Sequence, residues 1–182
     1  KPTSANQDRS PWLQESVSLV NKAVFDLRHY AGTDMGSTLV MALIDGNKAY
    51  VAHVGDSRAY LINDKGIQRL TTDHSLVERL VATNQITPEE ARTHPQRNVI
   101  YRTIGDKHRV EPDVSAHILS PGDHLLLCSD GLTGMLEDDL IRKIVIERAS
   151  SPQEACNLLI QAANAAGADD NVTAVMAQII QP

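Results

Sequence analysis

Three aspartates of this 182-residue chain stand where predicted strands and helices meet loops, at Asp73, Asp130 and Asp170. A carboxylate at such a junction can face a cleft while the sheet fixes its backbone. Carboxylate oxygens are the ligands that Mg²⁺ and Mn²⁺ prefer. Two such ions about 3.5–4 Å apart can generate a nucleophilic hydroxide and clamp a phosphoryl group. An aspartate beside glycine or asparagine is equally typical of a turn, so spacing alone leaves both interpretations open.

The other reactive side chains match no common catalytic or zinc-binding motif. The seven histidines form no His-x-x-x-His pair and the two cysteines no Cys-x-x-Cys pair, which disfavours a zinc site. The sequence also lacks a Gly-x-x-x-x-Gly-Lys phosphate loop and a Gly-x-Ser-x-Gly nucleophile motif. His53, within an alternating strand pattern, is interpreted as a core or surface residue. His74 directly follows Asp73, and we expect it to have a supporting or structural role.

The composition bounds the class of protein. A net charge of −6 argues against sequence-independent binding to nucleic acid, which needs Lys and Arg to neutralise phosphates. An enzyme acting on phosphate esters tolerates this charge, because bound cations can reverse the local field. The longest apolar runs are too short to cross a membrane and no signal peptide is evident, so we expect a cytoplasmic protein. Cys128 and Cys156 are accordingly expected to be buried free thiols.

Hydrophobic periodicity predicts an α+β domain over residues 1–182. A helix is expected to begin at Ser10, with its hydroxyl as the cap and Pro11 in the first turn, and to end near Gly32. Turn signals then separate apolar runs that we expect to form an antiparallel meander, at 38–44, 48–54, 58–62 and 67–70. The last third of the chain predicts a strand, two helices and a final strand, at 124–128, 137–148, 152–167 and 171–180.

Residues 75–105 interrupt this regular pattern. Ser75 to Glu78 and Thr87 to Glu90 both have the spacing of a helix capping box. The stretch that follows is rich in arginine and has little regular periodicity. We interpret 75–105 as an excursion from the core, and such excursions often carry function.

Several short motifs follow one another along the chain: Asp34 to Thr38, Gly55 to Tyr60, Thr72 to His74, Ser129 to Leu132, and Asp170 with Asn171. In this order they resemble the protein phosphatase type 2C family. These metal-dependent, PPM-type serine/threonine phosphatases resemble the chain from about Trp12 to Ile180, most closely in their bacterial branch. The resemblance implies a sandwich of two antiparallel β-sheets flanked by helices, with the family's amino-terminal strands missing from this chain.

The resemblance also implies roles for single residues. Asp130 and Asp170 correspond to ligands of two core Mn²⁺ or Mg²⁺ ions, and Asp73 to the ligand of a third, weaker ion. Asp56 and Arg58 correspond to a buried, hydrogen-bonded structural pair. The excursion at 75–105 corresponds to a flap that influences substrate access. The implied reaction is hydrolysis of phosphoserine and phosphothreonine in proteins by metal-activated water, without a phosphoenzyme, and no catalytic residue is assigned.

The same resemblance implies partners and leaves one alternative open. Phosphorylated proteins are the expected substrates, and a partner serine/threonine kinase in a signalling system is expected. The family's Arg…Asn-Glu-Asp and Asp-Gly-Met-Gly-Gly motifs, of which the latter supplies a bridging aspartate, have no counterpart here. The alternative is therefore a pseudophosphatase or truncated binding module with reduced activity and metal affinity. Missing strands would also expose sheet edges, which invites dimerisation or chain exchange.

Overall fold

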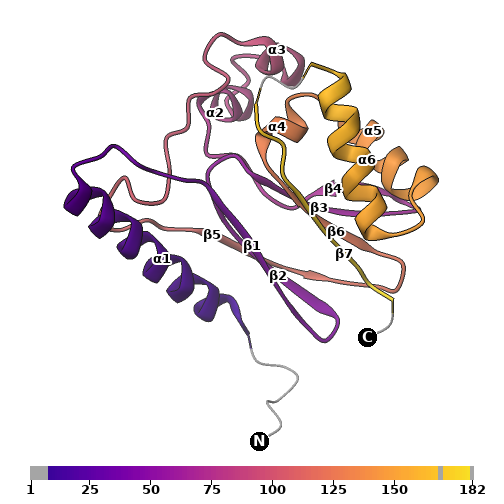
Figure 1. Ribbon diagram of the computed structural model, residues 1–182, viewed down its shortest axis with the longest axis horizontal. Coiled ribbons are helices and arrows are strands. Elements are labelled where there is room, and N and C mark those ends of the chain that lie inside the picture. The colour runs from indigo at the N-terminus through magenta and orange to yellow at the C-terminus, as the bar shows by residue number, and fades with distance from the viewer. Residues whose placement is uncertain (1–7, 168–169, 181–182) are drawn as a thin grey trace, which may run out of the picture. The chain divides into compact units, whose positions relative to one another are not determined.

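The structure, a computed structural model, describes residues 8–167 and 170–180 (Figure 1). The chain divides into two compact units. The first unit comprises residues 1–56 and 72–117, and the second comprises 57–71 and 118–182. No helix among the described residues is both long enough and apolar enough to cross a bilayer.

The first unit is built on a three-stranded sheet with the order β1-β2-β5. Its strands are β1 (Leu39–Asp45), β2 (Lys48–Val54) and β5 (Asp113–Ile118). β1 and β2 form a hairpin in the register Leu39↔Val54 to Asp45↔Lys48. Its turn includes Gly46, whose positive φ of 60° suits glycine. The helices of this unit are α1 (Ser10–Ala31), α2 (Leu76–Ala82) and α3 (Pro88–Thr93).

Helix α1 lies along the β1–β2 hairpin and closes the core of the first unit (Figure 1). Leu13 and Val17 of this helix are fully buried in one cluster with Tyr50, Ala52 and Val54 of β2. The expected end at Gly32 is confirmed, since that residue is the left-handed cap with φ 62°. The expected hydroxyl cap is wrong. Arg9 occupies the N-cap position, and Asp8 Oδ1 instead accepts a bond from the Ser10 N–H at 3.0 Å.

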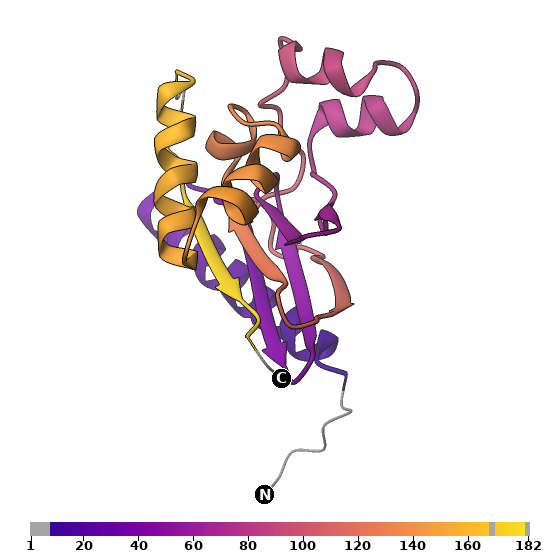
Figure 2. The same ribbon diagram turned by 90° about the vertical axis from the view of Figure 1, so that its right-hand side faces the viewer.

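The second unit is built on a four-stranded sheet with the order β4-β3-β6-β7. Its strands are β3 (Arg58–Asn63), β4 (Gly66–Arg69), β6 (His124–Cys128) and β7 (Ala174–Gln178), and each neighbouring pair is antiparallel. The helical segments are α4 (Asp130–Thr133), α5 (Asp138–Lys143), the π-helix η1 (Ile144–Arg148) and α6 (Pro152–Ala165). Helix α6 runs beside β7 (Figure 2).

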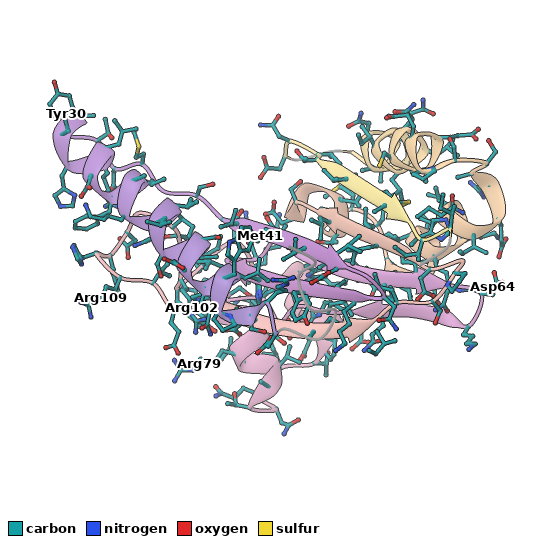
Figure 3. The ribbon with its side chains drawn as sticks, turned by 90° about the horizontal axis from the view of Figure 1, so that it is seen from below. Tyr30, Met41, Asp64, Arg79, Arg102 and Arg109 are labelled. Carbon is teal, nitrogen blue, oxygen red and sulfur yellow. The ribbon has the colours of Figure 1, made fainter. Side chains whose placement is uncertain are left out.

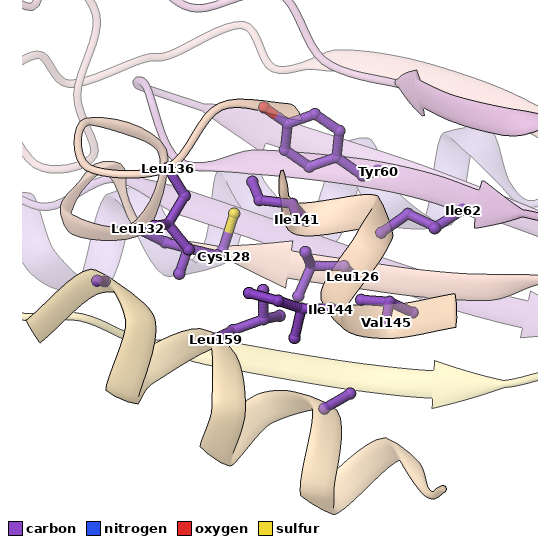
Figure 4. Packing of buried hydrophobic residues seen from close by; sticks show 12 residues of the cluster. Tyr60, Ile62, Leu126, Cys128, Leu132, Leu136, Ile141, Ile144, Val145 and Leu159 are labelled. Atoms are coloured by element: carbon purple, nitrogen blue, oxygen red, sulfur yellow. The ribbon is translucent and has the colours of Figure 1, made fainter. Parts of the chain in front are cut away.

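The core of the second unit lies between its sheet and its helices (Figure 4). Tyr60 of β3 and Leu126 of β6 have no exposed surface, and neither does Leu159 of α6. Burying a side chain of this size stabilises a fold by about 1.5–3 kcal/mol. Burial also raises the pKa of the Tyr60 hydroxyl, although Arg58 donates a hydrogen bond to its oxygen at 3.2 Å. This core holds β6 and β7, the two strands that lead to Asp130 and away from Asp170.

The predicted fold class is confirmed, because two antiparallel sheets flanked by helices are present. The predicted meander is wrong: β1–β2 and β3–β4 are hairpins of different sheets. The chain leaves the first sheet at Gly55, whose φ of 113° is accessible mainly to glycine. Strand β5 was not predicted, because its sequence, Asp-Val-Ser-Ala-His-Ile, contains no continuous apolar run.

The Leu159 core position offers a stability test. We expect Leu159→Ala to lower the free energy of unfolding by about 2–5 kcal/mol, because a fully buried leucine leaves a cavity. Leu140→Ala is the matched control, since Leu140 on α5 of the same unit is 37% exposed and its loss should stay below about 1 kcal/mol. Urea unfolding followed by circular dichroism measures both, and equal losses would contradict the packing described.

Candidate metal centre

Asp130 stands where strand β6 ends and the short helix α4 begins. Cys128 at the end of the strand is buried, Ser129 is the extended N-cap residue, and Asp130 is the first helical residue. An acidic side chain in a first helical turn is favoured by the partial positive charge of the helix N-terminus. Asp130 is partly exposed, so its carboxylate is positioned by a rigid strand and still accessible from solvent.

Asp170 stands just before strand β7. It is exposed, and its Oδ1 accepts a hydrogen bond from the backbone N–H of Asn171 at 2.6 Å. This is the local turn interaction expected of an aspartate that precedes asparagine. Its neighbour Asp169 lies outside the described residues.

Ser129 and Gly131 bring together the two loops that carry Asp130 and Asp170. The Ser129 Oγ donates to the carbonyl of Asn171 at 3.2 Å and accepts from the N–H of Thr173 at 3.0 Å. The Ser129 N–H also donates to the Thr173 carbonyl at 3.1 Å. A Cβ added to Gly131 would lie 2.4 Å from the backbone carbonyl oxygen of Asn171 and 3.4 Å from that of Asp170. The two aspartate-bearing loops are therefore in backbone contact, and only glycine permits that approach.

The donor set of this loop pair suits a hard divalent cation. Two carboxylates, carried on backbone that the sheet fixes, provide oxygen ligands of the kind that Mn²⁺ and Mg²⁺ prefer. The residues present thus fit the metals that the sequence predicts. Asp130 and Asp170 lie on adjoining loops, and their role as ligands stays a prediction.

Asp73, the third predicted ligand, belongs to the first unit. It is 7% exposed and lies on a stretch without strand or helix between Leu70 and Ser75. Asp56, predicted to be half of a structural pair, is also buried in the first unit, and Arg58 is partly buried in the second. Their pairing stays a prediction.

A group of side chains that sequence analysis did not bring together surrounds His74. His53 and His74 are buried and stack with ring centroids 4.6 Å apart, and Asp113 completes a set whose potential ligand atoms lie within 4.8 Å of one another. Burial lowers the pKa of the His74 ring. Burial works to raise the pKa of the Asp113 carboxyl, but the hydrogen bond from Arg102 and the nearby His74 ring outweigh it, and that pKa is lowered.

Comparison with known proteins assigns the family. The sequence profile of protein phosphatase 2C matches residues 7–80 and 100–172. The chain belongs to the protein phosphatase 2C family. The break in the match, at 81–99, falls inside the predicted flap. The resemblance seen in the sequence is thereby confirmed, and the family makes the chain an enzyme of the metal-dependent protein serine/threonine phosphatase class.

Bacterial phosphatases are similar to this family member over most of its length. Protein phosphatase PhpP of Streptococcus pneumoniae serotype 2 is 42% identical over 167 residues, which cover 91% of this chain and 67% of PhpP. Serine/threonine phosphatase stp of Listeria monocytogenes serotype 4b is 36% identical over 169 residues, covering 92% and 67%. The chain thus spans about two thirds of the length of these relatives.

Solved structures extend the similarity to the fold. Stp1 of Staphylococcus aureus has a TM-score of 0.91 and 38% identity, over 97% of this chain and 70% of Stp1. The catalytic domain of the serine/threonine protein phosphatase PstP, solved with two manganese ions, has a TM-score of 0.87 and 33% identity over 100% of this chain and 74% of that domain. Asp130 and Asp170 therefore belong to a metal-dependent family, one relative of which was solved with two manganese ions.

Gly131 provides a test of the loop contact. We expect Gly131→Ala to destabilise the fold by about 1–3 kcal/mol, because the new methyl group would overlap the Asn171 backbone. Gly66→Ala is the matched control in the same unit, since no atom lies within 4 Å of the added Cβ. Urea unfolding midpoints compare the two. Equal urea midpoints for the two variants would contradict a stabilising contact between Gly131 and the Asn171 backbone.

Proposed function

We propose that this phosphatase 2C family member hydrolyses phosphoserine and phosphothreonine in proteins, with Asp130 and Asp170 as ligands of its two core Mn²⁺ or Mg²⁺ ions. The observation that supports the ligand assignment is the backbone contact of Gly131 with Asn171, which joins the two aspartate loops. The names of its relatives, PhpP and stp, support the substrate class. Comparisons with named phosphatases favour this function over a non-catalytic binding module.

The chain's own residues hold and orient the site. Strands β6 and β7 pair from His124↔Gln178 to Cys128↔Ala174, so the bases of both loops are fixed by one ladder. Ser129 extends that ladder by its side-chain and backbone bonds to residues 171 and 173. When bound, Mn²⁺ or Mg²⁺ would lower the pKa of a coordinated water and stabilise charge on the phosphoryl group. The carboxylates of Asp130 and Asp170 would hold the metal ion in place.

Asp73 and residues 75–105 complete the proposal in the first unit. We assign Asp73 to a third, weaker ion and 75–105 to a flap within the single phosphatase-like domain of residues 1–182. The two helices of the flap have few anchors, since neither α2 nor α3 contains a buried residue. Such segments belong to the low-stability part of a fold, from which substrate-gating loops are drawn.

The expected partners follow from the reaction. The substrates are phosphorylated proteins, and a serine/threonine kinase would form them in a signalling system. Cys128 and Cys156 are both buried. We assign the chain to the cytoplasm, where thiols stay reduced.

The ligand assignment of Asp130 has a direct activity test. We expect Asp130→Asn to lower manganese-dependent hydrolysis of a phosphothreonine peptide by more than about 100-fold, since loss of the partners that merely orient metal ligands already costs about 10–100-fold. Asp139→Asn, at an exposed position of α5, removes the same charge and should leave the rate unchanged.

The result also separates the two functions. Calorimetric titration of the unsubstituted chain with Mn²⁺ accompanies the assay. Undiminished activity of Asp130→Asn would refute the ligand assignment. If the unsubstituted chain showed no hydrolysis and no Mn²⁺ binding, the non-catalytic module would be supported instead.

We also propose that the chain associates with itself. β1 is an edge strand of its sheet, and unpaired edges invite pairing. Helix α1 in the same unit exposes a row of large apolar side chains, of which Tyr30 projects from its carboxyl-terminal end (Figure 3). The row consists of Trp12, Leu19, Val20, Leu27 and Tyr30. An exposed apolar row and an edge strand in the same unit both support association.

Light scattering at increasing protein concentration tests this association. The mean mass should rise towards that of a dimer, and Leu19→Lys should keep the chain monomeric because a charge interrupts the apolar row. Ser18→Lys, at an exposed polar position of the same helix, adds the same charge but should not prevent the association. A monomer at every concentration would refute the association.

A further inference from the structure

The backbone around Asp73 is held by two histidines in addition to a single antiparallel β-bridge between Ser75 and Ile100. The ring of His53 donates from Nε2 to the carbonyl of Thr72 at 2.8 Å. On the other side of Asp73, the N–H of His74 donates to the carbonyl of Gly55 at 2.8 Å, and the N–H of Tyr101 donates to the carbonyl of His74 at 2.9 Å. The residues before and after Asp73 are thus held separately, each by a buried histidine.

The His74 contact with Gly55 is reciprocal. While the His74 backbone donates to Gly55, the N–H of Gly55 donates back to Nδ1 of the His74 ring at 3.0 Å. Gly55 has φ 113°, and an added Cβ would lie 2.4 Å from Cγ2 of Thr38. The backbone at position 55 therefore has little freedom, and its N–H presents a fixed donor to the ring.

This fixed donor determines where the His74 ring carries its proton. A backbone N–H can only donate, so Nδ1 must supply a lone pair, and the neutral ring bears its hydrogen on Nε2. Nε2 is buried and has no hydrogen-bond partner of good geometry among the described residues. The Asp113 carboxylate oxygen Oδ2 lies 3.3 Å from it. That carboxylate is therefore the acceptor group that faces this hydrogen.

Asp113 is itself held by Arg102, which Figure 3 labels. The guanidinium Nη1 donates to Oδ1 of Asp113 at 2.6 Å and to the Glu111 carbonyl at 3.0 Å. One carboxylate oxygen therefore receives Arg102 while the other faces the His74 ring. The series Arg102, Asp113, His74 and Gly55 continues to the backbone of Asp73, all within the first unit.

A metal ion held by His53, His74 and Asp113 is the competing interpretation of this cluster. Two features disfavour it. The Gly55 N–H occupies Nδ1 of His74, so a metal on Nε2 would require loss of the remaining ring proton. The Asp113 carboxylate is already paired with the Arg102 cation, which would repel a second cation.

We propose that His74 is a positioning residue, whose ring, with its hydrogen on Nε2 and set between Gly55 and Asp113, fixes the backbone that presents the Asp73 carboxylate. The functional consequence rests on the proposed role of Asp73 as a metal ligand. The structural core of the proposal, the reciprocal lock between His74 and Gly55, can be measured without any metal.

Two amide substitutions at His74 separate the ring atoms. His74→Asn keeps an acceptor oxygen near the position of Nδ1, where the Gly55 N–H can still donate. His74→Gln moves the amide towards the position of Nε2 and leaves that N–H unpaired. We expect the Gly55 amide to exchange slowly with solvent in the unsubstituted chain and in His74→Asn, and much faster in His74→Gln. Nitrogen-15 spectra of the unsubstituted chain should show the Nε2–H form of the His74 ring.

Metal affinity is the second measurement. Mn²⁺ titration should show the affinity of the Asp73 site about 10- to 100-fold weaker in His74→Gln and largely retained in His74→Asn, with Asp73→Ala as the baseline without the site. Asp73→Ala without effect on Mn²⁺ binding would refute the ligand role of Asp73 in the proposed function. The amide exchange of Gly55 would still decide the lock itself.

Three results would overturn the proposal. Slow Gly55 exchange in folded His74→Gln would show that the ring does not hold the backbone, and an Nδ1–H form of His74 would contradict the proton assignment. A joint shift of the His53 and His74 ring signals with Zn²⁺ would favour the metal site. If both His74 variants fail to fold, Asp113→Asn at an exposed position replaces them, with faster exchange of the Nε2 hydrogen expected and unchanged exchange overturning the proposal.

Discussion

The approach of the Gly131 backbone to Asn171 is the constraint on which the core site depends. Asp130 and Asp170 are far apart in the sequence, and each by itself is an ordinary turn residue. The β6–β7 ladder ends at Cys128↔Ala174, and without a further contact the two loops beyond it would be free to separate. Ser129 and Gly131 supply that contact, one by hydrogen bonds and the other by the absence of a side chain. These contacts continue the β6–β7 ladder into the candidate site. The sheet therefore fixes the positions of the two loops.

Gly55 serves a similar end in the first unit by a different physical route. Gly131 is required because its surroundings leave no room, whereas Gly55 combines a left-handed φ with a wall formed by Thr38. Each glycine adjoins an aspartate in a short motif, Gly55-Asp56 and Asp130-Gly131. Close backbone approach next to a carboxylate lets rigid strands, rather than flexible side chains, set the position of charge. A preorganised charge needs little reorganisation when a ligand or transition state arrives.

Much of the local structure could be predicted because it is encoded locally. The end of α1 at Gly32 and the full capping box of Thr87 with Glu90 follow from single residues and their spacing. Sheet membership could not be predicted, because a period of two marks a strand without naming its partner. The β2 and β3 runs therefore suggested one meander, although the φ of Gly55 sends them into different sheets. The Ser10 cap failed for a related reason: the helix begins one residue earlier, with Arg9 as the N-cap and the Leu13 N–H bonded to the Arg9 carbonyl at 3.1 Å.

The site divides along the same line. Asp73, Asp130 and Asp170 could be singled out because motif order identified them, whereas the group of His53, His74 and Asp113 depends on β2 and β5 being placed in one sheet. That group also has an electrostatic logic. A protonated His74 ring would direct an Nδ1 hydrogen at the Gly55 donor and would add positive charge beside Asp73. Burial, which lowers the pKa of the ring, and the Gly55 N–H both favour the neutral form. A neutral ring can hold the backbone of Asp73, the carboxylate proposed to bind a cation, without repelling that cation, which a lysine or arginine at position 74 could not do.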